Sequence, residues 1–281
     1  MKLGLFGINF GPCAQPEVAV RVARAAEDAG FESVWTGEHV VLPDPQAPPS
    51  PVPAQTPMLD PAVALAFLAA HTTRLRLATG IVILPQRNPV VLAKEMASLD
   101  VLSKGRLVLG VGVGYLKPEF DAVGADFAQR GARMDEYLDA MLALWTQEKP
   151  AFAGETVRFA GVDAQPRPVQ KPHPPLVIGA MTPPAWRRAV LRANGWYGFA
   201  LDPARAAQQV AGLAEAAKRA LRPAALGPLE LTVTPPPGIP DADAVQRYRD
   251  LGVARLVLLP NALGADELVA FVDRAAGAVA R

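Results

Sequence analysis

The sequence predicts an α/β protein of the (β/α)8 class, a TIM barrel with loop insertions, formed by one domain over residues 1–281. Its length suits one parallel barrel, which commonly takes roughly 250 residues. Eight short runs rich in Leu and β-branched residues alternate with longer segments of helical period, as in repeated βαβ units. A hydrophobic content of 51% is enough for a large core.

Strands and helices are expected in strict alternation along the chain. The strands are predicted at residues 2–9, 33–36, 75–84, 106–111, 175–179, 196–200, 229–233 and 255–259. The helices are predicted at residues 17–29, 61–71, 90–102, 133–145, 184–193, 205–221, 243–251 and 265–279. Eight strands with eight helices predict a closed barrel with the helices outside it.

The first helical segment, residues 17–29, shows the signals that justify such an assignment. Val18 and Val22 fall on one face of the helix and Arg21 falls on the other, so the apolar face packs on the barrel. Gly30 follows as a C-cap, and the next strand begins directly after it.

Three connections exceed the two to six residues that are usual between α/β elements. Residues 40–60 and 115–130 are expected to be long loops at the C-terminal ends of strands, where barrels of this class carry their functional groups. Residues 152–167 contain a hairpin-like stretch, which we interpret as a small insertion and not as a second domain.

Composition excludes several classes of function. The 28 basic and 27 acidic residues give a net charge of +1, and no run of like charges indicates a nucleic-acid or membrane surface. Apolar stretches end well before the roughly 20 residues of a membrane span, and no signal peptide is recognisable. One cysteine and three scattered histidines predict neither an internal disulfide nor a metal site. We expect a cytoplasmic protein that acts on a small molecule.

Candidate site residues are those that close the predicted strands, because side chains in this architecture act from strand C-termini. They are Glu38 and His39 after the second strand, Thr79, Gly80 and Ile81 after the third, Gly112 and Gly114 after the fourth, and Gly179, Ala180, Met181 and Thr182 after the fifth.

His39 is the main catalytic candidate. It follows a strand end beside the Glu38 carboxylate, which suits a proton donor or acceptor near neutral pH. The alternative, a structural histidine that hydrogen-bonds a loop carbonyl, has equal weight from position alone. His71 and His173 are assigned structural roles, and Cys13 is expected to be a bystander thiol.

Backbone groups supply the other candidate contacts. Gly112 and Gly114 leave room for a flat ring or a backbone to approach closely, and tight packing at the barrel mouth is the alternative. No helix is expected directly after them, because Pro118 intervenes. Thr182 has the position of an N-cap, so free N–H groups beyond it could hold a phosphate, with Arg188 adding positive charge.

Several motifs in one order resemble the luciferase-like monooxygenase superfamily. They are GFESVWTGEHV from residue 30, RLRLATGIVILPQRNP from residue 74 and LSKGRLVLGVGVGY from residue 102. RGARMDEY from residue 130 and PVQKPHPP from residue 168 resemble the branch that uses the deazaflavin coenzyme F420. The resemblance covers nearly the whole chain up to about residue 199 and is weaker beyond.

The resemblance implies that the barrel holds F420, or FMN in sister branches, at its C-terminal mouth. A cis peptide bond at Gly80–Ile81 is implied against the ring, with the acid and histidine at Glu38 and His39 beside it. The residues near Gly112 and the loop after the fifth strand are implied to hold the cofactor's tail. The helices at 61–71 and 90–102, rich in Ala, Leu and Val, are similar to those through which relatives form homodimers.

Departures from the family pattern narrow these expectations. Tyr115 stands where F420-dependent sugar-phosphate dehydrogenases carry a glutamate, which argues against glucose 6-phosphate oxidation. Val113 stands where luciferase subunits place an arginine for the FMN phosphate, which favours F420. The leading expectation is an F420-dependent oxidoreductase that transfers a hydride between the deazaflavin and a small organic substrate. The alternatives are an FMN-dependent monooxygenase and a non-catalytic barrel that binds a flavin or another ligand.

Overall fold

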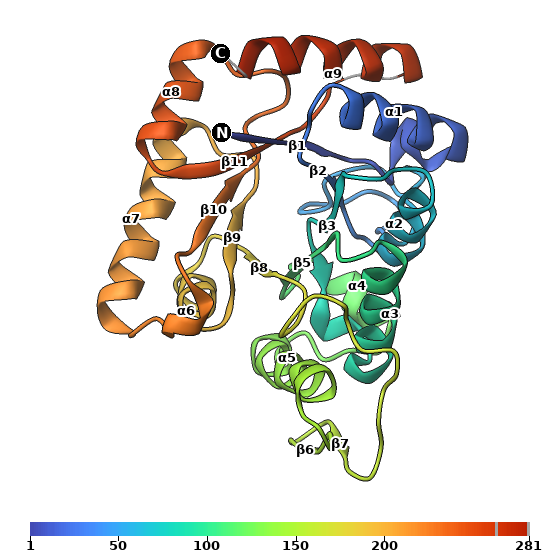
Figure 1. Ribbon diagram of the computed structural model, residues 1–281, viewed down its shortest axis with the longest axis vertical. Coiled ribbons are helices and arrows are strands. Elements are labelled where there is room, and N and C mark those ends of the chain that lie inside the picture. Colours follow the sequence, from blue (N-terminus) through green and yellow to red (C-terminus); the bar gives the residue numbers. More distant parts are fainter. Residues whose placement is uncertain (262–263, 280–281) are drawn as a thin grey trace.

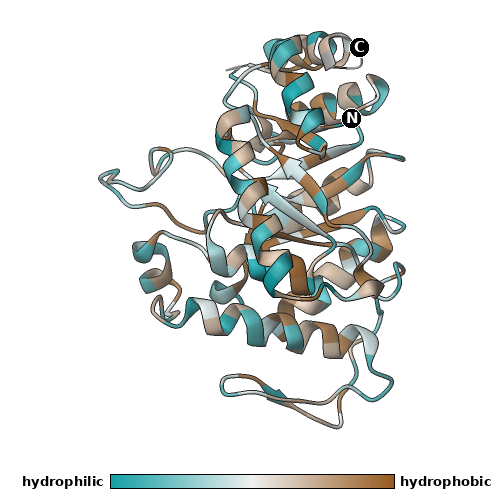
Figure 2. Cartoon of the chain, turned by 90° about the vertical axis from the view of Figure 1, so that its left-hand side faces the viewer, coloured by the Kyte–Doolittle hydropathy of each residue, from teal (hydrophilic) through white to brown (hydrophobic). Residues whose placement is uncertain are grey.

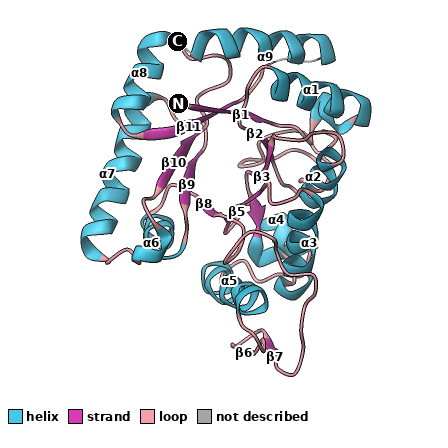
Figure 3. Cartoon of the chain, viewed as in Figure 1, coloured by secondary structure: helices cyan, strands magenta, loops and turns pink. Residues whose placement is uncertain are grey.

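The computed structural model, which describes residues 1–261 and 264–279, contains a closed barrel of parallel strands (Figures 1 and 3). Around the ring the strands are β1 (Lys2–Phe6), β2 (Ser33–Thr36), β3 (Arg76–Thr79), β5 (Leu107–Gly112), β8 (Leu176–Gly179), β9 (Gly195–Gly198), β10 (Glu230–Val233) and β11 (Val253–Leu258). Pairing of β3 with β5 and of β1 with β11 closes the ring. The predicted fold class is confirmed.

Helices surround the barrel (Figure 1). They are α1 (Pro16–Asp28), α2 (Pro61–Ala69), α3 (Pro89–Leu102), α5 (Arg130–Thr146), α6 (Pro183–Arg192), α7 (Pro203–Arg219), α8 (Ala242–Asp250) and α9 (Ala265–Val279), with short 3-10 turns at Gly11–Ala14, Leu84–Gln86 and Ala224–Leu226. Helix α9 packs beside α1, which brings the last helix next to the first. The predicted alternation therefore holds along the described chain.

Three local features refine the expected elements. The third predicted strand is divided by a cis peptide bond at Gly80–Ile81, so that β4 (Val82–Ile83) pairs with β5 beyond it. The expected loop 115–130 contains a helix, α4 (Lys117–Ala122), and the expectation that Pro118 prevents one was wrong. Proline is tolerated in the first turn, where its missing N–H would have no helical acceptor. The expected hairpin is confirmed as β6 (Phe152–Ala153) with β7 (Arg158–Phe159).

Two apolar layers hold the barrel together, one inside it and one between strands and helices. The inside layer contains Phe6, Trp35, Ala78, Val108, Val177, Tyr197 and Val257. Figure 2 shows the strands mostly in hydrophobic colours, with helices that alternate between hydrophobic and hydrophilic stripes. In α1 Val22 and Ala26 are fully buried, as expected for its inward face. Strand ends, and not the filled interior, are therefore left for ligands.

A buried arginine occupies the end of the barrel opposite the mouth. The side chain of Arg255 is 2% exposed, and its guanidinium donates to both carboxylate oxygens of Glu32 and, at 2.5 Å, to Glu230. Its guanidinium carbon lies 5.7 Å from the centroid of the Trp35 ring. Burial raises the pKa of Glu32 and of Glu230, but contacts with Arg255, and for Glu230 also with Lys2, outweigh it, so that both carboxyls have pKa values below the usual 4.5.

These carboxyls predict a loss of stability in acid. A carboxyl whose pKa is lowered by folding stabilises the protein above its unfolded pKa, and this contribution disappears as pH falls through the lower folded value. We expect the free energy of unfolding, measured by urea titration, to fall as pH decreases below 4.5. Arg255→Met should make this dependence shallower, and an unchanged slope would contradict the prediction.

Candidate active site

His39 lies at the mouth of the barrel, directly after β2, between two polar side chains. Its Nδ1 is 3.2 Å from a carboxylate oxygen of Glu119, and its Nε2 is 3.3 Å from the hydroxyl of Tyr115. The His39 side chain is 9% exposed, whereas Tyr115 is 49% exposed at the outer end of the row. A carboxylate, an imidazole and a phenol that contact one another in a row can carry a proton between the buried interior and the mouth.

Glu119 is the site residue that the sequence analysis missed. Its side chain is completely buried, and its second carboxylate oxygen accepts a hydrogen bond of 2.5 Å from the Val40 N–H. It stands in the first turn of α4, after the glycine-rich end of β5. A signal was present: Pro118 at the second position of a helix is typical of a helix start, which would have placed Glu119 beside the strand ends.

Glu38, expected beside the cofactor and paired with His39, has other partners. Its carboxylate accepts hydrogen bonds from the Ile83 N–H and from two guanidinium nitrogens of Arg87. Burial raises the pKa of the Glu38 carboxyl, and Arg87 and the Ile83 N–H oppose that rise. The carboxylate next to His39 is therefore Glu119, not Glu38, because the two neighbouring side chains of the extended segment diverge.

Two side chains fix both ends of the loop after β2. Arg87 also donates to Asp60 at 2.6 Å, and Asp60 is the N-cap of α2. The Asn9 amide joins the backbone of Gly37, at the start of the loop, to the Leu59 carbonyl at its end. The position of His39 is thus set by the barrel and by α2, together with Met58, whose sulfur accepts a hydrogen bond from the His39 N–H at 3.2 Å.

The room left by the mouth glycines is filled by protein side chains. A Cβ on Gly112 or on Gly179 would lie 2.6 Å from the side chain of Ile81, and one on Gly114 would lie 2.6 Å from Ile83. Tight packing, the alternative weighed for Gly112 and Gly114, accounts for the absent side chains there, and the same holds at Gly179. The side chain of Ile81 therefore packs against Gly112 and Gly179, and that of Ile83 packs against Gly114.

Other predicted contact groups already have protein partners. The Thr79 hydroxyl donates to the Gly110 carbonyl and accepts from the Gly110 N–H. The Ala180 carbonyl accepts a hydrogen bond from the Trp196 indole, while the Met181 side chain is exposed.

The start of α6 offers fewer anion-binding groups than expected. Thr182 has the N-cap position but its side chain makes no capping hydrogen bond. Pro183 and Pro184 have no N–H, so two of the usual free donors of a first turn are missing. Arg188 donates to both Asp135 oxygens, and its charge is therefore paired.

The mouth nevertheless has the composition of a site for a flat heteroaromatic ring. Phe199 is partly exposed there, with its ring centroid 5.0 Å from that of Phe6, and Ile81 is partly exposed nearby. The Thr36 hydroxyl at the end of β2 is buried without a hydrogen-bond partner among the described residues. Apolar walls with a few polar groups are typical of cofactor sites. The residues present fit a flavin or deazaflavin ring.

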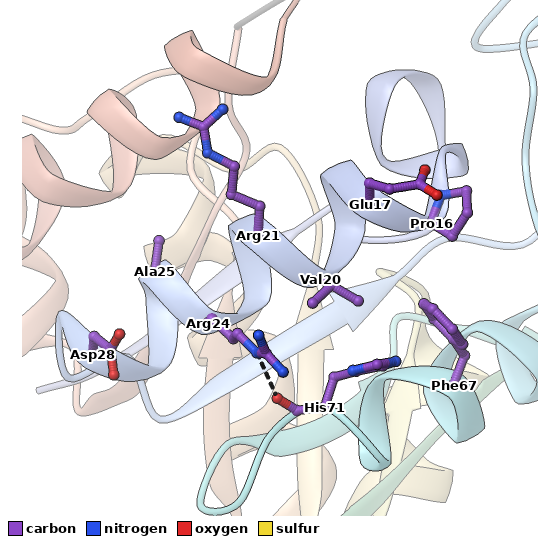
Figure 4. A pocket seen from close by; sticks show the side chains of 9 residues that line it. All are labelled: Pro16, Glu17, Val20, Arg21, Arg24, Ala25, Asp28, Phe67 and His71. Atoms are coloured by element: carbon purple, nitrogen blue, oxygen red, sulfur yellow. Dashed lines mark hydrogen bonds between the residues drawn. The ribbon is translucent and has the colours of Figure 1, made fainter.

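The remaining titratable candidates lie outside this site, as expected. His173 Nδ1 is 2.8 Å from the Pro174 carbonyl, and burial raises the pKa of the Cys13 thiol to about 12. His71 lines a hollow of about 780 Å³ between α1 and α2, on the outer side of the barrel (Figure 4). Its walls carry charged side chains from α1 and Phe67 from α2, and it contains none of the strand-end residues, so we place the chemistry at the mouth.

Two classes of feature are absent from the part of the chain that the structure describes. No helix there has both the length and the apolar character needed to cross a membrane. Nor do residues 1–261 and 264–279 bring together three or more His, Cys, Asp or Glu side chains that could hold a metal ion.

Comparison with known proteins identifies relatives of this architecture. The sequence profile of the luciferase-like monooxygenase family matches residues 7–255. An uncharacterized protein of Mycobacterium tuberculosis is 34% identical over 272 residues, which covers 92% of each chain. The oxygenase component of a flavin-dependent trigonelline monooxygenase from Acinetobacter baylyi is 31% identical over 173 residues, or 61% of this chain and 45% of the relative.

A solved structure supports the fold independently. An F420-dependent secondary alcohol dehydrogenase, in complex with an F420–acetone adduct, superposes with a TM-score of 0.80 at 17% identity. The match covers 99% of this chain and 98% of that structure.

Proposed function

Because this chain belongs to the luciferase-like monooxygenase family, whose members are flavin- or F420-dependent oxidoreductases, we propose that it is an F420-dependent oxidoreductase. It transfers a hydride between the deazaflavin and a small organic substrate. The observation that carries this proposal is the His39 ring at the barrel mouth, which has a buried carboxylate on one nitrogen and a phenol on the other.

In this proposal different residues of the mouth support the ring, contact the cofactor's tail and transfer the proton. Ile81, Phe6 and Phe199 would support the ring, and the backbone of the loop from Gly179 to Thr182 would contact the tail. When bound, F420 supplies the hydride-carrying carbon of its central ring. His39 would hold or release the proton that accompanies the change in charge on the substrate.

Val113 supports F420 over FMN as the cofactor. Luciferase subunits place an arginine for the FMN phosphate at the position that Val113 resembles. Val113 brings no charge there. The similarity of the whole barrel to an F420-dependent alcohol dehydrogenase is compatible with this assignment.

We expect purified protein to bind F420 in the micromolar range or tighter and to bind FMN at least tenfold more weakly. Fluorescence titration with each cofactor separately measures both affinities. Stabilisation by each cofactor in a thermal-unfolding series is an independent check, since a ligand at 100 times its Kd adds about 2.7 kcal/mol. Tight FMN binding without measurable F420 binding would overturn the assignment.

An FMN-dependent monooxygenase is the second candidate, supported by the 31% identity to the oxygenase component from Acinetobacter baylyi. The two candidates differ in their need for oxygen. An F420-dependent hydride transfer proceeds equally well under anaerobic conditions, whereas a monooxygenase reaction stops without O2. A rate that is lost when O2 is removed would favour the second candidate.

We further propose that the protein is a homodimer that buries the outer faces of α2 and α3. These adjacent helices expose apolar side chains: Val63 is 67% exposed and Val91 is 55% exposed, with Phe67 nearby in the wall of the hollow in Figure 4. Exposed apolar patches of this kind mark interaction surfaces.

Light scattering at micromolar concentration should give about twice the chain mass of 29.7 kDa. Val63→Asp should shift the mass to that of one chain, because it buries a carboxylate in the interface. Leu221→Asp, on an exposed residue after α7, is the matched control and should leave the dimer intact. A mass of one chain for the unchanged protein would contradict the proposal.

A further inference from the structure

We propose that Glu119 is a positioning residue that selects the tautomer of His39, placing the ring proton on Nδ1 and leaving Nε2 as an acceptor for the Tyr115 hydroxyl. The catalytic consequence rests on the proposed function. The tautomer itself is a property of the chain and can be measured without cofactor or substrate.

The first step of the argument is the buried carboxylate. One oxygen of Glu119 is 2.5 Å from the Val40 nitrogen, and a backbone N–H can only donate. The other oxygen is 3.2 Å from His39 Nδ1. With one oxygen occupied by a backbone donor, the Glu119 carboxylate offers the ring an acceptor on its other oxygen. The Nδ1 atom must therefore carry a hydrogen.

The second step concerns the opposite side of the ring. A neutral imidazole with a proton on Nδ1 has a lone pair on Nε2, and this atom is 3.3 Å from the Tyr115 oxygen. Burial, together with the neighbouring charge of Glu119, raises the pKa of Tyr115, so that its hydroxyl keeps the proton at neutral pH. Tyr115 accordingly donates to Nε2.

The third step is the direction in which a proton can move. Tyr115 is the half-exposed member of the row, and Glu119 is the buried one. When Nε2 takes the Tyr115 proton and Tyr115 regains one from the substrate or from solvent at the mouth, the imidazolium that forms has the Glu119 carboxylate on its other nitrogen. The same logic operates where a buried carboxylate orients a catalytic histidine. Glu119 thus fixes both the starting tautomer and the charge that follows.

The direct test is ¹⁵N NMR of the unchanged protein labelled on its histidine rings. The His39 signals are identified by their loss in His39→Ala, which separates them from those of His71 and His173. We expect the protonated, pyrrole-type nitrogen to be Nδ1 and the pyridine-type nitrogen to be Nε2. A proton on Nε2 in the unchanged protein would overturn the proposal, and the tautomer is read from the unchanged protein, with His39→Ala used only to assign the signals.

Glu119→Gln provides the second test because it keeps the size of the side chain and removes its charge. The amide oxygen must take the Val40 N–H, so the amide NH2 faces Nδ1 and requires an acceptor there. We expect the ring proton to move to Nε2 and turnover to fall at least about 100-fold. Asp121→Asn, on the exposed side of α4, is the matched control and should change neither the tautomer nor the rate.

Failure of this proposal and failure of the proposed function are distinguishable. An unaltered His39 tautomer in Glu119→Gln overturns the role of Glu119, whatever the cofactor. A protein that fails to bind F420 overturns the F420 assignment and leaves the NMR result intact.

Discussion

Replacement of His39 by Ala is expected to reduce turnover at least about 100-fold, while the affinity for the cofactor changes by less than tenfold. Acid–base assistance by a positioned side chain is typically worth about 100- to 10,000-fold, or about 3 to 5 kcal/mol of barrier. The anchors of the mouth, Arg87 with Glu38 and Asn9 with Gly37, remain in this variant. The ring site therefore keeps its shape when the imidazole is removed.

Steady-state turnover and cofactor titration together check this expectation. His71→Ala is the control, because His71 lies in the hollow between α1 and α2, away from the mouth. Near-normal turnover in His39→Ala would show that the histidine is structural and that Tyr115 or water carries the proton. If His39→Ala instead fails to bind the cofactor, His39 belongs to the binding site and not to the proton transfer.

Replacement of Arg87 by Met is expected to cost about 3 to 5 kcal/mol of the free energy of unfolding, the penalty for leaving a buried carboxylate without its cation. The Glu38 side chain is 2% exposed and depends on Arg87 for most of its hydrogen bonds. Burial already raises the pKa of Glu38, so loss of the guanidinium leaves this carboxyl to fold in its protonated form.

Urea unfolding of three variants checks this expectation. Glu38→Gln combined with Arg87→Met should be more stable than Arg87→Met alone, because a neutral amide needs neither a cation nor protonation of a carboxyl on folding. Arg192→Met removes a cation whose carboxylate partner, Asp139, is 49% exposed, and should cost less than about 1 kcal/mol. Equal losses for Arg87→Met and Arg192→Met would contradict the argument.

The barrel was predictable from sequence because each strand is a short apolar run followed by a turn and an amphipathic helix. The spacing of apolar residues reflects which side chains are buried, and the pattern of burial is similar in all parallel barrels. It does not report peptide geometry: the run from Arg76 to Ile83 is continuous in composition, yet the chain turns at Gly80–Ile81. The first strand likewise ends at Phe6, before Gly7 with its positive φ, although the prediction extended it to residue 9.

The candidate site was predictable only in part. His39 follows from its place after a strand, a local property. Its carboxylate does not, because Glu119 is 80 residues away in sequence and reaches the ring only through the turn of α4. Glycines set a similar limit on what can be predicted from sequence. Sequence indicates that a side chain is excluded at Gly112, but only the packed structure identifies Ile81 as the group that fills the space.

The fixed ends of the segment after β2 make that segment exchangeable. Asn9 and Arg87 attach its two ends to the scaffold, next to Gly37 and at Asp60, and Met58 accepts a hydrogen bond from the His39 N–H, so the side chains of residues 41–57 are not needed to hold the ends. Closing a flexible loop becomes harder only slowly with length, by about 0.6 kcal/mol for each doubling. Loops of other lengths and compositions can therefore be grafted between residues 41 and 57 without displacing His39, which makes this segment a natural module for laboratory evolution of new substrate preferences.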